Sequence, residues 1–365
     1  MAKGFTLEIN PFCYLAQYQD NNSWSEKLIE KPHLSKEEED KLSDEERRVY
    51  MLKRNSFEEL PIVNYTTQYG MGCFEGLKAF PQKDGSLKLF RPDENAKRMA
   101  TSMSGLMMPA FPPELFVNAV KGLICANQKA GFTPKYDSDW EKDDFLLGHS
   151  VYVRPFSYSE PGIGINLSYK PWVVIVSTNV GTYFMPGNTK ALTTPMVRAF
   201  PGGTGWIKCS ANYVISTLAK KRAIAQGYME AIFLDAKEQK YFEEGSSCNL
   251  FFLLKNDTLV TPALRDTVLP GITRKSIMSL AQQKGIKTEE RQISVDEVFA
   301  EAKEVFVSGT ASGVFYIESI THNGKTAEFN NGKMGEVTHY FLKTLKGIQY
   351  GAIEDSFGWM VECKQ

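Results

Sequence analysis

One lysine in this 365-residue chain stands in a setting that favours covalent chemistry with carbonyl compounds. Lys208 follows the glycine-rich stretch 202–205 and precedes residues 209–213, which are mostly small and open a predicted helix. A lysine among small and apolar groups loses hydration, and the neutral amine that this favours forms Schiff bases. Taken alone, the same setting fits an ordinary surface lysine at a helix start, which is the more common case.

An acid further along the chain could serve the same chemistry. Glu244 lies between two strand-like runs, where a carboxylate has little access to water and needs a cationic partner. A protonated pyridine nitrogen would be such a partner. A salt bridge or a turn would explain this acid equally well.

Two turns have the composition of anion sites. Residues 269–274 form a turn that launches a helix, with exposed amides at Ile272 and Thr273, and residues 309–311 form a second turn after a strand-like run. Free amides and the positive end of the dipole attract anions to helix amino termini. Ordinary helix capping is the simpler explanation of the first turn considered alone.

Other common sites find little support. The four histidines are far apart with no carboxylate at ligand spacing, and the six cysteines contain no C-x-x-C pair, so we expect no metal site and no disulfide framework. The 162–167 stretch lacks the third glycine of a dinucleotide motif. Scattered cysteines are typical of a reducing cytoplasm.

The charge balance points toward small-molecule partners. The chain has 42 Lys+Arg and 43 Asp+Glu, a formal net charge of −1, and therefore no excess of basic residues for nucleic acid or an anionic membrane. The first residues do not resemble a secretion signal, and no apolar run approaches the roughly 20 residues that span a bilayer. We expect a soluble cytoplasmic protein.

The elements that must position these groups alternate between helices and strands, which predicts a mixed α/β (α+β) fold. Two capping boxes in the charged stretch 35–48 predict short surface helices. The turn-rich stretch around 181–188 predicts a linker over 179–191, between a small amino-terminal domain (1–178) and a large domain (192–365) that carries Lys208. Apolar periodicity predicts helices at 113–129, 212–226, 273–284 and 296–302, and strands at 86–90, 172–177, 230–235, 248–254 and 304–307.

Taken together, seven segments resemble the fold-type IV enzymes that use pyridoxal 5'-phosphate, most closely the branched-chain amino acid aminotransferases. They occur in the family's order, from about residue 65 to the carboxyl end, whereas residues 1–60 do not match the usual pattern. The resemblance implies a small α/β domain, a larger barrel-like α/β domain and a homodimer. The segments are residues 74–80, 89–92 with 97–99, 152–155, 198–205 leading to Lys208, 244–251, 269–274 and 308–311.

The resemblance assigns a role to each candidate residue. Lys208 would be the Schiff-base lysine and the general base, and Glu244 would keep the pyridine nitrogen protonated, so that the ring accepts electrons released at Cα. Tyr213 would bind the phenolic oxygen, and Ser247 would line the ring. The phosphate would contact Arg98, Ile272, Thr273 and Thr310.

The substrate side follows from the same resemblance. Thr310 and Ala311 would receive the α-carboxylate, and Arg154 would pair with the distal carboxylate of glutamate in the second half-reaction. Aromatic walls around an aliphatic side chain would come from Tyr69, Phe74, Tyr152 and Tyr183.

The expected reaction is transfer of the amino group of leucine, isoleucine or valine to 2-oxoglutarate. Rival readings are a D-amino acid aminotransferase or an aminodeoxychorismate lyase on the same fold, and a non-catalytic protein that retains the fold. Residues 312–315 lack the C-x-x-C pair of mammalian relatives, so we expect no thiol regulation there.

Overall fold

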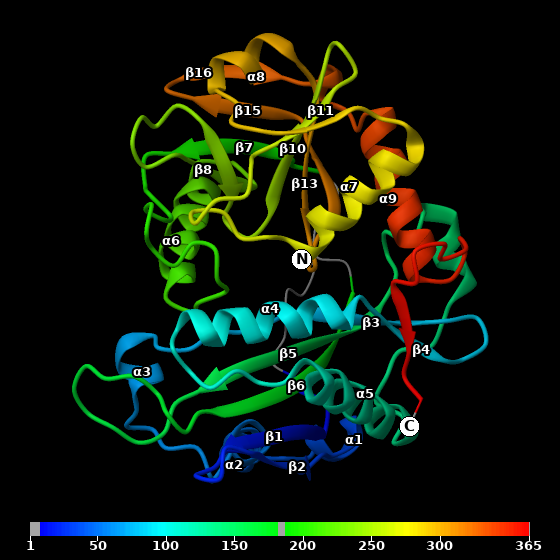
Figure 1. Ribbon diagram of the computed structural model, residues 1–365. Coiled ribbons are helices and arrows are strands. Elements are labelled where there is room, and N and C mark those ends of the chain that lie inside the picture. The colour runs from blue at the N-terminus through cyan, green and yellow to red at the C-terminus, as the bar shows by residue number, and fades with distance from the viewer. Residues whose placement is uncertain (1–7, 182–186, 365) are drawn as a thin grey trace.

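The computed structural model describes residues 8–181 and 187–364, and in these ranges the chain forms two β-sheets with their own helices (Figure 1). The first sheet has seven strands in the order β17-β4-β3-β5-β6-β1-β2, and every neighbouring pair is antiparallel. Its strands are β1 (Phe12–Tyr18), β2 (Trp24–Glu30), β3 (Leu77–Pro81), β4 (Leu87–Phe90), β5 (Ser150–Tyr158), β6 (Trp172–Val180) and β17 (Met360–Glu362).

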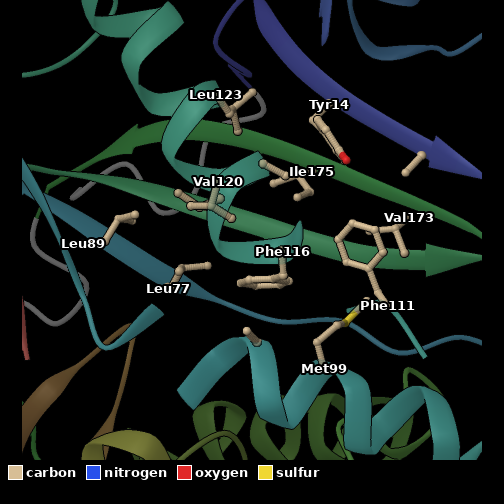
Figure 2. Close-up of a cluster of buried hydrophobic side chains, with 14 of the residues drawn as sticks. Tyr14, Leu77, Leu89, Met99, Phe111, Phe116, Val120, Leu123, Val173 and Ile175 are labelled. Carbon is tan, nitrogen blue, oxygen red and sulfur yellow. The ribbon is translucent and has the colours of Figure 1, made fainter. Parts of the chain in front are cut away.

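Two helices complete the core of this first unit. Helix α5 (Pro113–Lys129) matches the predicted helix 113–129, because proline starts it and Phe116, Val120 and Leu123 recur at helical spacing and are fully buried. Figure 2 shows these three side chains in one cluster with Met99 of α4 (Pro92–Gly105) and residues of the sheet. Each such burial contributes about 1.5–3 kcal/mol. The cluster makes the sheet a rigid floor beneath α4.

The charged stretch forms the surface helices that the capping boxes predict. Helix α2 (Asp44–Asn55) begins after Ser43, whose side chain accepts the amide of Glu46 while the Glu46 carboxylate accepts the amide of Ser43. Ser35 and Glu38 exchange the same pair of bonds at α1 (Lys36–Glu39). A third short helix, α3 (Tyr65–Tyr69), and a 3-10 helix at Ser138–Asp143 complete this part.

The second sheet has ten strands and contains both parallel and antiparallel pairs. Its main path is β12-β11-β10-β9-β8-β7-β15-β16, with β13 against β10 and β14 against β13. The strands are β7 (Lys190–Thr194), β8 (Glu230–Leu234), β9 (Phe242–Gly245), β10 (Asn249–Leu254), β11 (Leu259–Thr261), β12 (Thr288–Glu290), β13 (Ala302–Gly309), β14 (Gly313–Ile317), β15 (Ser319–His322) and β16 (Lys325–Glu328). The mixed α/β class predicted from the sequence is confirmed.

Four helices pack on the second sheet, and three of them lie within two residues of the predicted bounds. They are α6 (Asn212–Ala225), α7 (Ile272–Lys284), α8 (Val295–Glu301) and α9 (Glu336–Gln349), and a 3-10 turn at Asn330–Gly332 precedes α9. No helix in the described part of the chain combines the length and apolar character needed to span a bilayer.

The two units share one hydrophobic cluster. Phe80 and Phe90 of the first sheet pack in the same buried group as Phe251 and Phe306 of the second. Strand β17 also returns to the first sheet and pairs with β4, although its residues lie within the predicted large domain. The chain bounds 1–178 and 192–365 therefore do not follow the sheets at this end, because β4 offers an open edge to the returning chain. The rest of the domain division stays a prediction.

Candidate active site

A cavity of about 570 Å³ lies between the two units and gathers residues from both. Helix α4 runs along the side of the first sheet that faces the second unit (Figure 1), and an ion pair between Lys275 of α7 and Glu94 of α4 links the two. Predicted site residues that line the cavity are Phe74, Arg98, Tyr152, Arg154, Lys208, Tyr213, Glu244, Ser247, Ile272, Thr273, Thr310 and Ala311.

Lys208 is held at the centre by backbone bonds to the first unit. Its amide donates to Ser102 Oγ (3.0 Å), and its carbonyl accepts the amide of Phe74 (3.1 Å). The half-buried ammonium donates to the Tyr213 hydroxyl (2.8 Å) from one turn before α6 properly begins. Bonds to Ser102, Phe74 and Tyr213 thus fix the position of Lys208 and direct its amine into the cavity, so it is not a free surface lysine.

An aromatic and cationic wall stands beside the lysine. The ring of Phe74 packs edge-on against Tyr213, with centroids 4.7 Å apart, and the Lys208 ammonium lies 4.9 Å from the Phe74 centroid. The Arg154 guanidinium covers the same ring at 4.6 Å and donates to the Tyr152 hydroxyl (2.7 Å). The Nε of Arg154 is buried with no hydrogen-bond partner among the described residues, so this arginine retains donors for a ligand.

At one end of the cavity, Arg98 is paired with a fully buried carboxylate. Arg98 Nε and Nη2 donate to the two oxygens of Glu75 (2.7 and 2.9 Å), and Nη1 donates to the Pro270 carbonyl (3.0 Å). Asn95 also donates to Glu75 (2.7 Å). Burial acts to raise the pKa of Glu75, but the Arg98 guanidinium outweighs it and the pKa lies below its usual value. Three of the five N–H groups of Arg98 are used, which leaves two.

The amino terminus of α7 lies at the same end. Its N-cap is Gly271, which makes no side-chain cap, so the first amides of the helix are not satisfied by a side chain. A Cβ at Gly271 would collide with Oδ1 of Asn249, which explains the glycine. Free amides, the helix dipole and Arg98 together form a site suited to a phosphate-sized anion.

A second acid that lines the cavity, Glu244 on β9, is buried and faces a different arginine. An ion pair joins it to Arg198 Nη2, the Leu269 amide donates to the carboxylate, and Asn249 Nδ2 donates to its second oxygen (3.3 Å). Arg198 also donates to the carbonyls of Gly205 and Thr267. Burial raises the pKa of Glu244, and the guanidinium offsets this only in part. The carboxylate therefore has an unusually high affinity for a proton.

The pKa of the neighbouring acid, Glu243, is raised as well. Burial raises the pKa of Glu243 to about 7, although the Thr267 hydroxyl donates to its carboxylate (2.6 Å) and acts in the opposite direction. The charge of Glu244 adds to the rise. Two adjacent carboxylates thus share a region that disfavours a second negative charge.

Two buried serine hydroxyls also belong to the wall of the cavity. The hydroxyls of Ser246 and Ser308 are buried with no hydrogen-bond partner among the described residues, and both residues line the cavity. Buried hydroxyls of this kind cost free energy unless a ligand satisfies them. They lie near Ser247 and Thr310, the predicted ligand-binding positions.

One predicted residue does not line the cavity, and another lies outside the described residues. Tyr69 is 47% exposed and does not line it, because α3 ends at Gly70 (φ 68) and the chain turns there before reaching Phe74. Tyr183 lies outside the described residues. Of the expected aromatic wall, Phe74 and Tyr152 line the cavity, and the substrate contacts of all four residues stay a prediction.

Sequence reasoning gave no role to Glu75, Asn95 or Arg198, although two of them lie in quoted segments. A glutamate between an aromatic residue and an apolar strand carries a signal, since it must be buried and needs a partner. The partner could not be identified because Arg98 lies 23 positions away on a different element. Metal binding finds no support: the described ranges contain no cluster of three or more His, Cys, Asp or Glu side chains suited to it.

Comparisons with known proteins are consistent among themselves. The family model for class IV amino-transferases matches residues 72–320. A probable branched-chain-amino-acid aminotransferase of Staphylococcus epidermidis is 38% identical over 304 residues, covering 80% of this chain and 81% of that protein. The mitochondrial branched-chain amino acid aminotransferase 1 of Humulus lupulus is 39% identical over 298 residues, covering 80% and 72%.

Solved structures agree with these relatives. The branched-chain aminotransferase of Thermoproteus uzoniensis, solved with norvaline, superimposes with a TM-score of 0.72 at 27% identity and covers 84% of this chain and 95% of its own. The branched-chain amino acid aminotransferase of Escherichia coli gives 0.70 at 27% identity, covering 84% and 95%.

Proposed function

Because the chain belongs to the class IV aminotransferases and, within them, to the branched-chain amino acid aminotransferases, we propose the reaction and cofactor that its cavity serves. The amino group of leucine, isoleucine or valine passes to 2-oxoglutarate, with pyridoxal 5'-phosphate as cofactor. The amino acid becomes a 2-oxo acid, and 2-oxoglutarate becomes glutamate, so one amino group and one oxo group exchange.

The observation that carries this proposal is the position of Lys208. Its ammonium is hydrogen-bonded to Tyr213 and lies in a cavity that has an anion site at Arg98 and α7, and a buried carboxylate at Glu244. A phosphorylated pyridine has the matching features: a phosphate, a carbonyl carbon that reacts with an amine, and a ring nitrogen that takes a proton.

The residues present fit this cofactor. The free amides of α7 and the two unused N–H groups of Arg98 suit the phosphate, and Glu244 suits the ring nitrogen because a carboxylate with raised proton affinity shares a proton strongly with a base. The unpartnered hydroxyls of Ser246 and Ser308 supply further donors. Bound pyridoxal phosphate supplies a carbonyl for covalent linkage to amines and a ring that takes up electrons released at the substrate Cα.

The protein's own residues move protons and exclude water. Lys208 Nζ is placed to take the proton from the substrate α-carbon and return it later in the reaction, and the Tyr213 hydroxyl keeps the amine oriented between these events. Phe74 packs against Tyr213 and shields the amine from one side, which preserves a dry site where electrostatic interactions are strong.

We assign substrate selection to the aromatic side chains near Lys208 and to the turn at residues 309–311. Phe74 and Tyr152 supply apolar surface for a branched side chain, and Thr310 and Ala311 supply the turn for the α-carboxylate. Arg154 retains unused donors, including its buried Nε, for the distal carboxylate of 2-oxoglutarate and glutamate. One pocket thus accepts an aliphatic and an acidic substrate in turn.

The test is a half-reaction screen of the purified protein loaded with pyridoxal phosphate. Individual L-leucine, L-isoleucine, L-valine, L-glutamate, D-alanine and aminodeoxychorismate are added, and the visible absorption band of the bound cofactor is followed. We expect the band to shift with the four L-amino acids and not with D-alanine or aminodeoxychorismate. A response to D-alanine or aminodeoxychorismate alone would contradict the substrate assignment.

A second readout tests the lysine without any turnover. Borohydride reduction followed by mass spectrometry should find the cofactor on the peptide that contains Lys208. Lys208→Ala should lose this label and the visible band, while Lys237→Ala, a change of an exposed lysine, should keep both. Retention of the label in Lys208→Ala would overturn the assignment.

We also propose a homodimer located in the cytoplasm. Apolar side chains stay exposed on α6 and in the loop before it, with Val214 64%, Leu218 46% and Phe200 62% exposed, and exposed apolar groups are common at interfaces. All six cysteines are free thiols, which suits a reducing compartment. Light scattering of the wild type and of Leu218→Glu tests the assembly, since the variant should have half the mass.

A further inference from the structure

A buried ion pair that does not line the candidate active site joins strand β8 to helix α6. Glu230, the first residue of β8, is fully buried, and its Oε2 lies 3.0 Å from the ammonium of Lys220 on α6. Its other oxygen, Oε1, accepts the backbone amide of Ala231 (3.0 Å). A carboxylate taken out of water is costly unless its oxygens are satisfied in this way. The proposed reaction uses neither Glu230 nor Lys220.

The same carboxylate also holds the turn at residues 245–248. Glu230 Oε1 accepts the backbone amide of Ser246 (3.1 Å). Within the turn, the Gly245 amide donates to the Cys248 carbonyl (2.8 Å). The turn is therefore closed by its own backbone and attached to the rest of the second unit through one acidic side chain.

Cavities border this turn on two sides, so close packing alone does not hold it in place. Ser246 and Ser247 line the candidate active site, of about 570 Å³, and also a second cavity of about 250 Å³ that α6 borders. Side chains keep one position where neighbours surround them closely, and open space removes such contacts. The position of the turn therefore depends on hydrogen bonds. A bond from an amide to a carboxylate is about twice as strong as a neutral one.

Helix α6, at the other end of the ion pair, carries a residue that orients the lysine amine. Tyr213, in the first turn of the helix, accepts a hydrogen bond from the Lys208 ammonium (2.8 Å). Lys220 lies about two turns further along the same helix. Its bond to Glu230 thus fixes α6 relative to the turn at residues 245–248.

We propose that Glu230 and Lys220 are positioning residues for the transamination; this inference rests on the proposed function. The pair holds the turn at residues 245–248 at a constant distance from Tyr213, so that a ring bound in the cavity keeps one orientation toward the Lys208 amine. Both residues act through the backbone of the turn and through α6, since neither lines the cavity.

Hydrogen exchange of the purified full chain tests the contact without any turnover. The Ser246 amide is bonded to Glu230 in the wild type, and we expect the peptide with residues 245–248 to exchange roughly tenfold faster in Glu230→Leu. Glu230→Gln keeps an oxygen for this amide and should exchange more slowly than Glu230→Leu. Lys220→Met removes the partner of the carboxylate and should also speed exchange. Lys221→Met, a change of the exposed neighbour, should exchange like the wild type.

Spectra and kinetics of the holoenzyme give the second readout. The visible circular dichroism of the bound cofactor reports its fixed orientation, and we expect it to weaken in Glu230→Leu and in Lys220→Met. In both variants kcat for L-leucine should fall roughly tenfold to a hundredfold with KM unchanged, because orientation affects the chemical step more than substrate binding. Glu230→Gln should retain more of the signal and of kcat than Glu230→Leu, and Lys221→Met should retain both in full.

Three results would overturn the proposal. Lys220→Met could lower Tm yet keep the visible circular dichroism and kcat of the wild type, which would leave the pair a role in folding alone. Glu230→Gln could lose as much as Glu230→Leu, or exchange at residues 245–248 could stay unchanged in Lys220→Met. Should Glu230→Leu fail to fold, Lys220→Met and Lys221→Met carry the comparison, because the Lys220 side chain is 21% exposed. Failure of the proposed function would differ, since the wild type itself would then lack the visible band and turnover.

Discussion

The cavity is bounded by two buried carboxylate–arginine pairs that behave in opposite ways. At the α7 end, Glu75 takes two bonds from Arg98, one from Asn95 and one from the Gly76 amide. On β9, Glu244 has one ion pair with Arg198, one bond from the Leu269 amide and one longer bond from Asn249. The pKa of Glu75 lies below its usual value, and that of Glu244 lies above it.

The difference lies in hydrogen bonding, since both acids are buried and both face an arginine. A carboxylate that accepts four donors is stabilised in its charged form, and its arginine can still present spare N–H groups to an anion. A carboxylate with fewer donors remains available to a further partner. The first pair is therefore suited to holding a phosphate in place, and the second to sharing a proton with a ligand.

Removing the charge of Glu75, whose carboxylate accepts four hydrogen bonds, should have the largest effect on stability. Glu75→Gln leaves Arg98 as an uncompensated buried charge, so we expect a loss of about 3–5 kcal/mol in the free energy of unfolding. Urea unfolding measures it. Glu94→Gln on the same helix as Arg98 breaks a partly exposed ion pair and should cost at most about 1 kcal/mol. Equal losses of stability in Glu75→Gln and Glu94→Gln would show that the buried pair contributes no more than the partly exposed one.

The raised pKa of Glu243 predicts that the variant Glu243→Gln is more stable than the wild type. The folded chain keeps a proton on Glu243 up to about pH 7, whereas its ordinary value is 4.5, so stability present below pH 4.5 is lost as the pH rises through 7. Glu243→Gln keeps the acceptor for Thr267 and removes this loss. The variant should be more stable by up to about 3 kcal/mol at pH 8 and by about 1 kcal/mol at pH 5.

Urea unfolding at both pH values measures this difference. A gain of the same size at pH 5 and pH 8 would show that packing, and not protonation, is responsible. Glu75→Gln should show no comparable gain at either pH, because the pKa of Glu75 is shifted in the opposite direction.

Removing the acid that we assign to the ring nitrogen should affect catalysis more than folding. For Glu244→Gln we expect turnover of L-leucine to fall about a hundredfold, or about 2.7 kcal/mol of barrier. Arg198 keeps the Gly205 and Thr267 carbonyls, so the loss of stability should be smaller than for Glu75→Gln. Parallel kinetics and unfolding compare the two, with exposed Glu238→Gln as the control. Full turnover in Glu244→Gln would remove the assigned role.

The smallest effect on stability and on KM is expected for Tyr69, which does not line the cavity. Tyr69→Phe removes a hydroxyl from an exposed side chain and should leave stability within about 0.5 kcal/mol and KM for L-leucine unchanged. Tyr152→Phe removes the bond to Arg154 and should raise KM for 2-oxoglutarate. A larger effect on KM from Tyr69→Phe than from Tyr152→Phe would support the sequence-based assignment of Tyr69 to the substrate pocket.

The features that depend on a local sequence pattern could be predicted from the sequence. Helix 113–129 follows from its proline start and apolar spacing, and Lys208 and Glu244 stand in short segments with a clear chemical logic. Pairings between distant elements were not predicted. Glu75 with Arg98 and Glu244 with Arg198 depend on how distant segments meet, and no local period encodes that. The surface position of Tyr69 depends on a single left-handed turn at Gly70.

The return of β17 to the first sheet has a consequence for how the chain is made. Strand β17 leaves the ribosome after every strand of the second sheet, yet its partner β4 belongs to the unit synthesised first. Until then, β4 presents an unpaired edge, and unpaired edges in partly folded chains promote aggregation. During biosynthesis the first unit therefore depends on release of the carboxyl-terminal segment to close its edge, so truncation before residue 360 should reduce the yield of soluble protein.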